Sequence, residues 1–442
     1  MKNKILTGLL LVLIGGWGSL SAQNVGSNYA RQVNTLIGTK GVGLTSGYLY
    51  PGATYPYGMV QFTPSYFSKR SGFVINQLSG GGCEHMGNFP TFPVKGKLKM
   101  SPDNILNYRI NISEEKGHAG YYEAKVQEDI HAKLTVTERT GMASYEYPAD
   151  QQYGTVIIGG GISATPIDQA AIVITAPNKC EGYAEGGNFC GLRTPYKVYF
   201  VAEFDTDALE SGTWKRNELK PNTTFAEGEY SGVYFTFDVN KKKNIQYKIG
   251  VSYVSVENAR ENLKTENSGW DFLQIQNQAE SKWNHYLGKI EVEGSNPDRT
   301  TQFYTHLYRS FIHPNVCSDV NGEYMGADFR VHKSRSKHYT SFSNWDTYRT
   351  QIQLLSILDP EVASDIVISH QLFAEEAGGA FPRWVMANIE TGVMQGDPTP
   401  ILISNAYAFG ARNYDPKPIF KTMRKGAEEP GAMSQEVEAR PG

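Results

Sequence analysis

The stretch YKVYFVAEF, residues 196–204, has an apolar side chain at every second position. Side chains of a β-strand alternate between the two faces of a sheet, so this spacing predicts a strand with one face in a core. The same spacing recurs over 130–136, 233–239 and 245–253. Glycine- and asparagine-rich turns separate these segments, without helical crossovers between them. We therefore predict an antiparallel β-sandwich of two sheets up to about residue 255.

Beyond residue 255 the apolar spacing changes to three or four residues, which is the period of a helix with one buried face. This pattern runs through Phe272, Ile275, Ala279, Trp283 and Tyr286, then through Phe303, Leu307 and Phe311. Further helices are predicted over 345–355, over 362–373 after an Asp359-Pro360 start, over 402–409 and over 418–427. Strands followed by helices favour two domains over an alternating α/β sheet.

The polar stretch from His313 to Thr340 lies between these helices and is long for a loop inside a domain. Loops of this length are usually functional or disordered. The four or five helices of this region cannot close a barrel, and each would leave an apolar stripe uncovered. We therefore expect the sequence, which stops at Gly442, to be incomplete.

The composition bounds the class of partner and the compartment. The 442 residues carry a formal net charge of −3 with acids and bases interspersed, so no basic face for nucleic acid or anionic lipid is predicted. Lys2 and Lys4, the apolar run Ile5–Ile14 and the small residues up to Ala22 are typical of a secretory signal peptide. That run is too short for a permanent transmembrane anchor. We expect an exported protein, periplasmic or secreted, and leave its oligomeric state open.

The four cysteines, Cys83, Cys180, Cys190 and Cys317, are too few for a disulfide scaffold. In an oxidising compartment, Cys180 and Cys190 are the candidate pair for a bridge that closes a loop. Free thiols at both positions are the alternative, and the sequence does not choose between the two.

A dinucleotide fingerprint is suggested by Gly159, Gly161 and Ala164 after a strand, with Glu181 about twenty residues further on. Pro166 and the β-rich residues 171–174 leave no room for the crossover helix that would hold a pyrophosphate. We therefore favour a glycine turn between two strands.

The stretch LSGGGCEHMGNFP, residues 78–90, places Cys83, Glu84 and His85 directly after three glycines. A thiolate beside an imidazole suggests a nucleophile or a pair of metal ligands. The sequence has no second cysteine or histidine at a recognised zinc spacing, however. Consecutive glycines let a backbone approach another surface closely, so we favour a loop that reaches into the pocket of a neighbouring domain. A simple glycine-rich loop is the alternative.

Two pairs of a tryptophan and a carboxylate follow later in the chain. Trp345 and Asp346 lie at a predicted helix start, and Trp384 and Asp397 lie within PRWVMANIETGVMQGDPTP, residues 382–400. An aromatic face can stack on the apolar side of a pyranose while a carboxylate accepts hydroxyl hydrogen bonds. For the first pair the competing interpretation is a capping acid, Asp346, beside a core tryptophan. For Trp384 and Asp397 it is core packing.

Seven blocks of the sequence together resemble glycoside hydrolase family 92. They are VNTLIGTKG (33–41), YPGATYPYGMVQFTPS (50–65), LSGGGC (78–83), YKVYFVAEF (196–204), SYVSVENARENL (252–263), FYTHLYRSFIHP (303–314) and WDTYRTQIQLLSILDP (345–360). The blocks occur in the family order and cover essentially the whole chain after the signal peptide, which makes the resemblance far more specific than any single motif.

The resemblance implies an N-terminal β-sandwich, a helical linker and an (α/α)6 barrel, with the active site between sandwich and barrel. We accordingly expect a signal peptide at 1–22, the sandwich at 23–255, the linker at 256–297 and an incomplete, N-terminal part of the barrel at 298–442. It also implies calcium-dependent, inverting hydrolysis of terminal α-linked mannose in N-glycans or mannans.

Inversion needs one carboxylic acid for the leaving oxygen and one carboxylate that activates water, about 6.5–9.5 Å apart. By the resemblance, both groups and the main calcium site lie in the C-terminal half of the barrel. No residue of this sequence is therefore assigned to acid–base catalysis or to the metal, and the acid and base are expected beyond Gly442. The chain itself is expected to lack hydrolytic activity.

The resemblance also assigns sugar contacts. From the sandwich they are Gly81, Gly82, Cys83, Glu84 and His85, and from the barrel they are Trp345 and Asp346. Trp384 and Asp397 remain a second candidate pair from the residue pattern alone. One departure is that residues 74–77, Val-Ile-Asn-Gln, replace the Ser-His-Thr-His of many family members, which leaves the mannosidic linkage open. Two alternative functions remain. One is a non-catalytic mannose-binding fragment, and the other is a glycosidase for another sugar.

Overall fold

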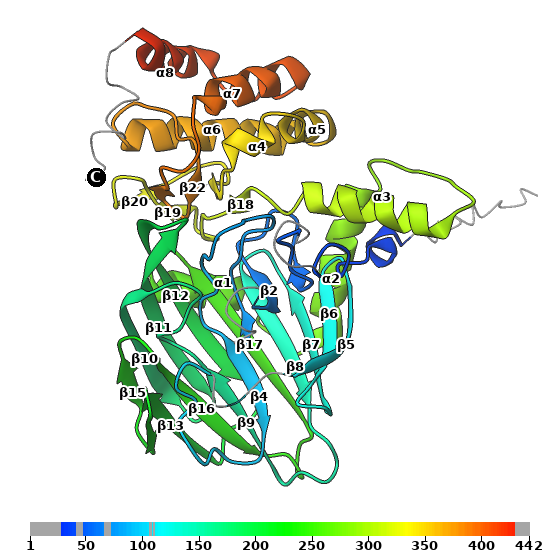
Figure 1. The fold of residues 1–442 in the computed structure, drawn as a ribbon, viewed down its shortest axis with the longest axis vertical. Coiled ribbons are helices and arrows are strands. Elements are labelled where there is room, and N and C mark those ends of the chain that lie inside the picture. Colours follow the sequence, from blue (N-terminus) through cyan, green and yellow to red (C-terminus); the bar gives the residue numbers. More distant parts are fainter. Residues whose placement is uncertain (1–27, 41–46, 66–71, 106–107, 109–110, 429–442) are drawn as a thin grey trace, which may run out of the picture.

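The computed structural model describes residues 28–40, 47–65, 72–105, 108 and 111–428, so the predicted signal peptide at 1–22 lies outside the described residues. Its first half consists of two antiparallel sheets that pack face to face (Figure 1). The strands of the first sheet are β1 Ala53–Thr54, β2 Gln61–Pro64, β3 Phe73–Val74, β4 Thr91–Lys95, β9 Tyr153–Ile158, β13 Glu210–Lys215, β14 Glu218–Pro221 and β16 Ser231–Asp238. Their order is β1-β2-β3-β4-β9-β16-β13-β14.

The second sheet contains the strand that the stretch 196–204 predicts. Its strands are β5 Ile112–His118, β6 Tyr121–Val126, β7 Ile130–Val136, β8 Thr140–Glu146, β10 Ile167–Ala176, β11 Lys179–Phe189, β12 Leu192–Phe204, β15 Phe225–Glu227 and β17 Asn244–Ser252. Their order is β15-β10-β11-β12-β17-β8-β7-β6-β5, and all neighbouring pairs are antiparallel. The predicted antiparallel sandwich is confirmed.

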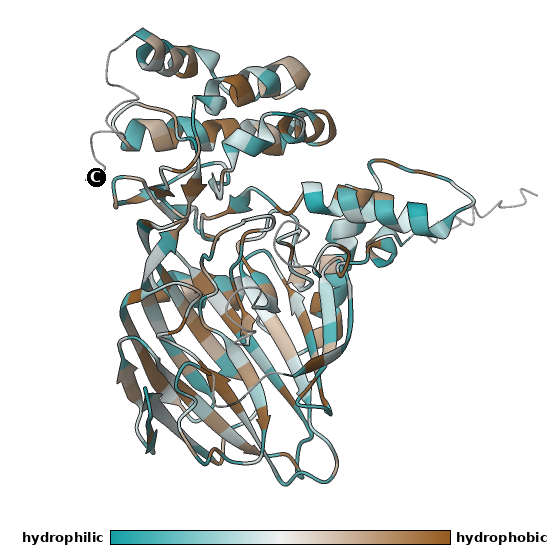
Figure 2. Cartoon of the chain, viewed as in Figure 1, coloured by the Kyte–Doolittle hydropathy of each residue, from teal (hydrophilic) through white to brown (hydrophobic). Residues whose placement is uncertain are grey.

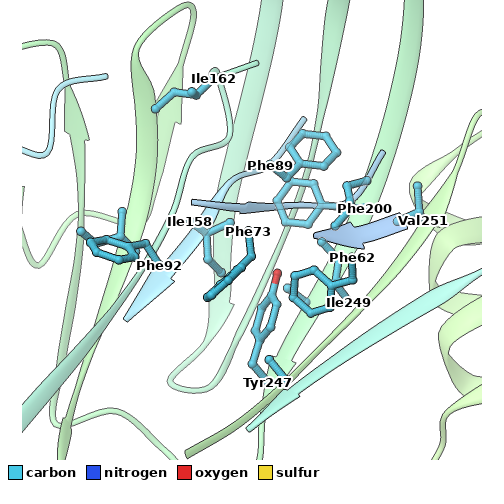
Figure 3. Close-up of a cluster of buried hydrophobic side chains, with 14 of the residues drawn as sticks. Phe62, Phe73, Phe89, Phe92, Ile158, Ile162, Phe200, Tyr247, Ile249 and Val251 are labelled. Atoms are coloured by element: carbon cyan, nitrogen blue, oxygen red, sulfur yellow. The ribbon is translucent and has the colours of Figure 1, made fainter. Parts of the chain in front are cut away.

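The core of the sandwich is filled by the alternating side chains of both sheets. Phe200 of β12 and Tyr247 of β17 point toward Phe62 and Phe73 of the first sheet (Figure 3). The ring centroids of Phe62 and Tyr247 are 6.3 Å apart, and those of Phe89 and Phe200 are 4.3 Å apart. Figure 2 shows apolar and polar residues alternating along the strands, as expected when one face of each sheet is buried.

The glycines after β9 form a turn between strands, as the sequence indicates. Residues 159–161 lead from β9 in the first sheet to β10 in the second, with no helix between them. A Cβ on Gly161 would lie 2.0 Å from the carbonyl oxygen of Gly228, so only glycine fits at this position. The glycines therefore serve close packing of the backbone.

The second half of the chain is helical. Its helices are α1 Val256–Glu266, α2 Phe272–Leu287, α3 Pro297–Ser310, α4 Asn344–Thr347, α5 Gln351–Leu358, α6 Pro360–Glu376, α7 Pro398–Phe409 and α8 Pro416–Glu428. Figure 1 shows α4–α8 as a stack above one end of the sandwich, and within the described residues this stack forms no closed barrel. In the same described residues no helix combines the length and the hydrophobicity that a membrane span requires.

Local signals explain where these helices begin and end. Asp359 caps α6 as predicted, because its carboxylate accepts the N–H of Val362 and Pro360 occupies the first turn. The single helix predicted over 345–355 is wrong, since α4 and α5 are separate. The break has a local cause: the side-chain amide of Gln353 donates to the carbonyl of Tyr348 at 2.9 Å, and the backbone of Thr350 is not helical.

The long polar stretch 313–340 is ordered by short antiparallel pairs. β18 Asn315–Val316 pairs with β21 Tyr339–Thr340, and β19 Glu323–Met325 pairs with β20 Val331–Lys333. A further pair, β22 Val385–Met386 with β23 Ile389–Glu390, lies in the same layer between sandwich and helices (Figure 1). This layer forms the junction on which the candidate site is built.

The N-terminal segment joins the two halves. The 3-10 helix η1, Tyr29–Gln32, packs with α2 and α3 rather than with the sandwich core. Trp283 of α2 is fully buried and donates its indole N–H to the carbonyl of Thr54 at 2.7 Å. The hydroxyl groups of Thr54 and Tyr308 are 2.7 Å apart. These contacts connect β1 to α2 and α3.

The substitution Trp283→Phe tests this joint. It removes the indole donor of the Thr54 carbonyl and part of a buried ring, so we expect the free energy of unfolding to fall by about 2–4 kcal/mol. Urea unfolding followed by circular dichroism measures the change. Trp270→Phe, at a partly exposed tryptophan, is the matched control and is expected to change stability by less than about 0.5 kcal/mol. Equal losses in the two variants would contradict the assigned role of Trp283.

Candidate active site

A cleft of about 460 Å³ lies between the sandwich and the helical half. This volume is within the usual range for small-molecule sites. The sandwich contributes residues 78–83 with Phe189 and Cys190, and the other wall comes from α3, the junction layer and α4–α7. That wall comprises Arg309, His313, Pro314, Ser341, Phe342, Ser343, Asn344, Asp346, Thr347, Gln351, Ile352, Leu355, Ile366, His370, Trp384, Met394 and Leu402.

The sandwich wall is a glycine loop, Leu78–Cys83, as the sequence predicts. Gly80 has a φ of +86°, a left-handed conformation that favours glycine. A Cβ on Gly81 would lie 2.8 Å from the ring of His85. The loop therefore requires glycine at both positions. At Gly80 the reason is the left-handed backbone, and at Gly81 it is the close contact with the imidazole of His85.

Two buried histidines hold the start of this loop. The Leu78 N–H donates to Nε2 of His85 at 2.8 Å, and the Ser79 N–H donates to Nε2 of His313 at 2.7 Å. Each imidazole must then carry its proton on Nδ1, which faces the Cys83 carbonyl in His85 and Oδ1 of Asn315 in His313. Both rings are thus neutral hydrogen-bond acceptors. One comes from the sandwich and the other from the segment after α3, so the loop is fixed to both halves.

The electrostatics of the two histidines follow from their burial. Burial lowers the pKa of His85 to about 4 and that of His313 to about 4, because a charged imidazole is poorly solvated there. At neutral pH both rings are uncharged and can accept the loop amides. His85 is therefore a support of the loop, and the predicted direct contact of its side chain with a ligand is not seen among the lining residues.

Cys83 forms a disulfide with Cys190, which corrects the predicted Cys180–Cys190 pair. Cys180 begins β11 and Cys190 follows the end of the same strand. Ten residues of extended strand span about 33 Å, so these two side chains cannot meet. Cys180 and Cys317 are free and buried. Because Cys83 is bonded, it is neither a nucleophile nor a metal ligand.

Trp384 and Phe189 form an aromatic surface in the cleft. Their ring centroids are 4.5 Å apart, and each comes from a different half of the chain. Glu390 accepts the backbone N–H groups of Arg383 and Trp384, and a β-bridge joins Trp384 to Ser343. Trp384 is only 6 % exposed, so it offers a cleft-facing edge and not a broad platform.

Asp346 lies in the first turn of the short helix α4 and is solvent-exposed at the cleft. The hydroxyl of Ser343 donates to one of its carboxylate oxygens. The neighbouring Trp345 is not among the lining residues, and the guanidinium of Arg349 lies over its ring at 4.8 Å. Consecutive helical residues point in different directions, so only one member of this pair faces the cleft.

Of the nine predicted contacts, Gly81, Gly82, Cys83, Asp346 and Trp384 line the cleft and the others do not. Glu84 is exposed, His85 is buried behind the loop, and Trp345 is not part of the lining. Asp397 precedes α7 in the N-cap position, where its side chain makes no capping hydrogen bond. Residues 74–77, which depart from the usual family motif, are buried behind the loop and outside the lining.

The sequence analysis missed several lining residues. Phe189 lies outside the segments that the sequence pattern singles out, and Arg309 and His313 occur there only within the FYTHLYRSFIHP block. Arg309 donates to the carbonyls of Thr35, Ile37 and Tyr50, an arrangement without any local sequence signal. The sequence around His313 likewise does not reveal that its partner, Ser79, lies 234 positions away.

The charge of the cleft limits its chemistry. Among the described lining residues Asp346 supplies the only carboxylate and Arg309 the only permanent cation. No group of three or more histidine, cysteine or acidic side chains that could hold a metal ion occurs within the described ranges. The cleft as described can bind a neutral polar ligand through one carboxylate, loop backbone groups and an aromatic surface.

Comparison with family models matches nearly all of the described chain. The model described as the glycosyl hydrolase family 92 N-terminal domain matches residues 32–252, and the one described as the family 92 catalytic domain matches 258–441. The boundary between the two matches coincides with the change from β17 to α1. Sequence of the catalytic domain is thus present, and both walls of the cleft lie within the matched regions.

The chain is also similar to individual known proteins. An uncharacterized secreted glycosidase of Arthroderma benhamiae is 26 % identical over 387 residues, which cover 77 % of this chain and 48 % of that protein. A family GH92 α-mannosidase of Bacteroides thetaiotaomicron superposes with a TM-score of 0.84 at 24 % identity, over 92 % of this chain and 57 % of that one. A GH92 inverting mannosidase of the same species gives 0.79 at 24 %, over 91 % and 55 %. The chain spans about half the length of these relatives.

The pair Gly81→Ala and Gly82→Ala tests the packing of the glycine loop. An alanine at 81 would press on the His85 ring, whereas one at 82 has as its nearest neighbour a Tyr48 ring atom at 3.9 Å. We expect Gly81→Ala to lower the free energy of unfolding by about 1–3 kcal/mol and Gly82→Ala to change it by less than about 0.5 kcal/mol. Urea unfolding measures both. The reverse order would show that the loop is packed differently.

The lowered pKa of His85 predicts acid sensitivity. Below pH 6.5 an unfolded histidine binds a proton that the buried ring does not accept until about pH 4, so stability falls as the pH falls through this window. His85 alone should remove about 2–3 kcal/mol between pH 6.5 and 4.5. Urea unfolding at several pH values measures this loss. His85→Gln should flatten the dependence, and the exposed control His285→Gln should not.

Proposed function

Because the chain belongs to glycosyl hydrolase family 92, we propose that the activity of the whole protein is the exo-acting, inverting hydrolysis of terminal α-linked mannose in glycans. The observation that carries this proposal is the cleft between sandwich and helices, where the glycine loop faces Asp346 and Trp384 across one small space. Similarity to solved α-mannosidases, one of them in complex with mannoimidazole, supports mannose as the sugar.

The cleft has the groups that a terminal sugar requires. The aromatic edge of Trp384 and Phe189 can pack on the C–H face of a pyranose. The exposed carboxylate of Asp346 can accept hydrogen bonds from two sugar hydroxyls, and such charge-assisted bonds are about twice as strong as neutral ones. Gly80–Gly82 lets the sugar approach the backbone without a side chain in between.

Acid–base chemistry needs a second carboxylate. Inversion uses two carboxyl groups about 6.5–9.5 Å apart, and the described lining has only Asp346. We propose a sugar-binding role for Asp346, and the acid, the base and the calcium site are then supplied by residues outside the described lining of this cleft. The same observation favours the second candidate function, a mannose-binding protein without hydrolytic activity, for the 442 residues taken alone.

Export is part of the proposal. The N-terminal sequence has the features of a signal peptide, and the Cys83–Cys190 disulfide is typical of oxidising compartments. The Arthroderma benhamiae relative is named a secreted glycosidase. Mannose-containing glycans outside the cytoplasm are therefore the proposed partners, with no role for nucleic acid.

Calorimetry with α-linked mannobioses tests sugar binding by this chain. We expect Asp346→Asn to weaken binding by about tenfold or more, because a carboxylate acceptor becomes a neutral amide. Asp150→Asn, at an exposed turn between β8 and β9, is the charge-matched control and should bind as the parent does. Equal affinity of the Asp346→Asn variant and the parent would remove Asp346 from the site.

Assay of mannose release separates the two candidate functions. We expect no release by the 442-residue chain, since the loss of general acid–base catalysis costs about 10²–10⁴-fold in rate. Release at a normal rate would show that the acid and base lie within this chain and would reject the binding-only function. Preferential binding of glucosides or galactosides would contradict mannose as the sugar.

A further inference from the structure

The glycine loop is bonded to both halves at its start, and Cys83 lies at its far end. Its first two amides are bonded to His85 and His313, and the Gly80 N–H donates to the Tyr48 carbonyl at 2.7 Å. Gly81 packs against the ring of His85, whose Nδ1 faces the Cys83 carbonyl, whereas a Cβ on Gly80 would meet no atom within 4 Å. Glycines have the largest backbone freedom of all residues, so a covalent bond at the far end restricts this turn further. Cys83 supplies that bond.

The partner of Cys83 lies on an equally irregular element. The strands β11 and β12 end in a hairpin tip with a register shift between Gly186 and Asn188. Gly186 and Gly187 have φ values of +154° and +139°, which bend the tip away from the regular sheet. The tip carries Phe189, which packs on Trp384 across the cleft. The tip is thus a part of the sugar site attached to the sandwich through a bulged, glycine-rich stretch.

The disulfide connects these two elements at the cleft itself. Cys83 and Cys190 both line the cleft, and their Cα atoms are 5.2 Å apart. The two cysteines are 107 positions apart in the chain. Cys83 packs against the edge of the sandwich core, to which Phe189 belongs, whereas Cys190 is exposed. The bond therefore fixes the spacing of two elements of the sandwich wall, the glycine loop and the hairpin tip.

We propose that the Cys83–Cys190 disulfide is a positioning element of the sugar site: it holds the glycine loop and the Phe189 tip at a fixed spacing, so that its loss weakens sugar binding while the fold persists. This inference rests on the proposed function of the cleft. The physical reason is preorganisation, because a loop that is already fixed in the free protein loses less conformational freedom when the ligand binds.

The test compares the chain with its Cys83→Ser/Cys190→Ser double variant. Calorimetry with α-linked mannobiose gives the affinity, and hydrogen–deuterium exchange gives the mobility of peptides that cover 78–85 and 186–192. We expect about tenfold weaker binding in the double variant and faster exchange confined to these two segments. Reduction of the parent with a phosphine, followed by alkylation, should reproduce both effects, because Cys180 and Cys317 are buried.

A stability control separates positioning from a general loss of stability. Val239→Ala removes two methyl groups from the sandwich core. Val239 follows the end of β16, where its N–H donates to the carbonyl of residue 152, away from the glycine loop. It should lower Tm but keep the affinity and the exchange of both segments. A double variant that stays folded and binds within twofold of the parent overturns the proposal, as does unchanged exchange in 78–85 and 186–192.

The remaining outcomes are also decisive. If neither the double variant nor the reduced parent folds, the disulfide is required for the fold, and the positioning role is rejected. If the parent binds no mannoside, the proposed function fails, whereas exchange of the two segments still decides whether the disulfide fixes them. The two ideas therefore fail by different observations.

Discussion

Arg309, in the last turn of α3, donates hydrogen bonds to the carbonyl oxygens of Thr35, Ile37 and Tyr50. Removing a guanidinium from water is expensive unless its donors find acceptors, and these carbonyls accept from both terminal nitrogens of Arg309, while its Nε has no hydrogen-bond partner among the described residues. The contact attaches the N-terminal segment to the helical half. Because β1 and β2 follow this segment directly, it also sets where the sandwich begins relative to α3. The position of both cleft walls depends on this attachment.

The same contacts of Arg309 explain which residues line the cleft. His313 and Asn315 follow α3 by a few residues, and Asn315 donates to the carbonyl of Gly58 next to β2. Once α3 is placed, His313 is within reach of the glycine loop, and the loop is within reach of the helices behind Asp346. The site therefore has one wall made of backbone, a disulfide and an aromatic edge, and a second wall with a single carboxylate. Such a surface can bind and orient a sugar, which is the part of the mannosidase function proposed for these residues.

The sequence predicts those features that depend on local spacing. Alternation in YKVYFVAEF predicts β12, the period of three or four predicts α2 and α3, and Asp359-Pro360 predicts the start of α6. It fails where distant segments meet. The partner of Cys190 is Cys83 and not Cys180, because a strand carries residues that are close in sequence far apart in space. His85 holds the loop from behind, since a glycine-rich turn gives no rule for the direction of the next side chain. The sequence identifies Asp346 by its position at a predicted helix start. It does not predict which other residues lie beside Asp346 in the cleft wall.

The N-terminal segment has a consequence for biosynthesis. Thr54 and its partner Trp283 are 229 positions apart in the chain. At about 5–20 residues per second, the ribosome needs roughly 10–45 seconds to produce the second after the first. During this time the sandwich strands emerge and can pair, but residues 29–57 have no helical surface to join. The family's two matched regions are therefore not two independent folding units. The segment that contains η1 and β1 is translated before the other described elements, yet it is among the last to reach its final place.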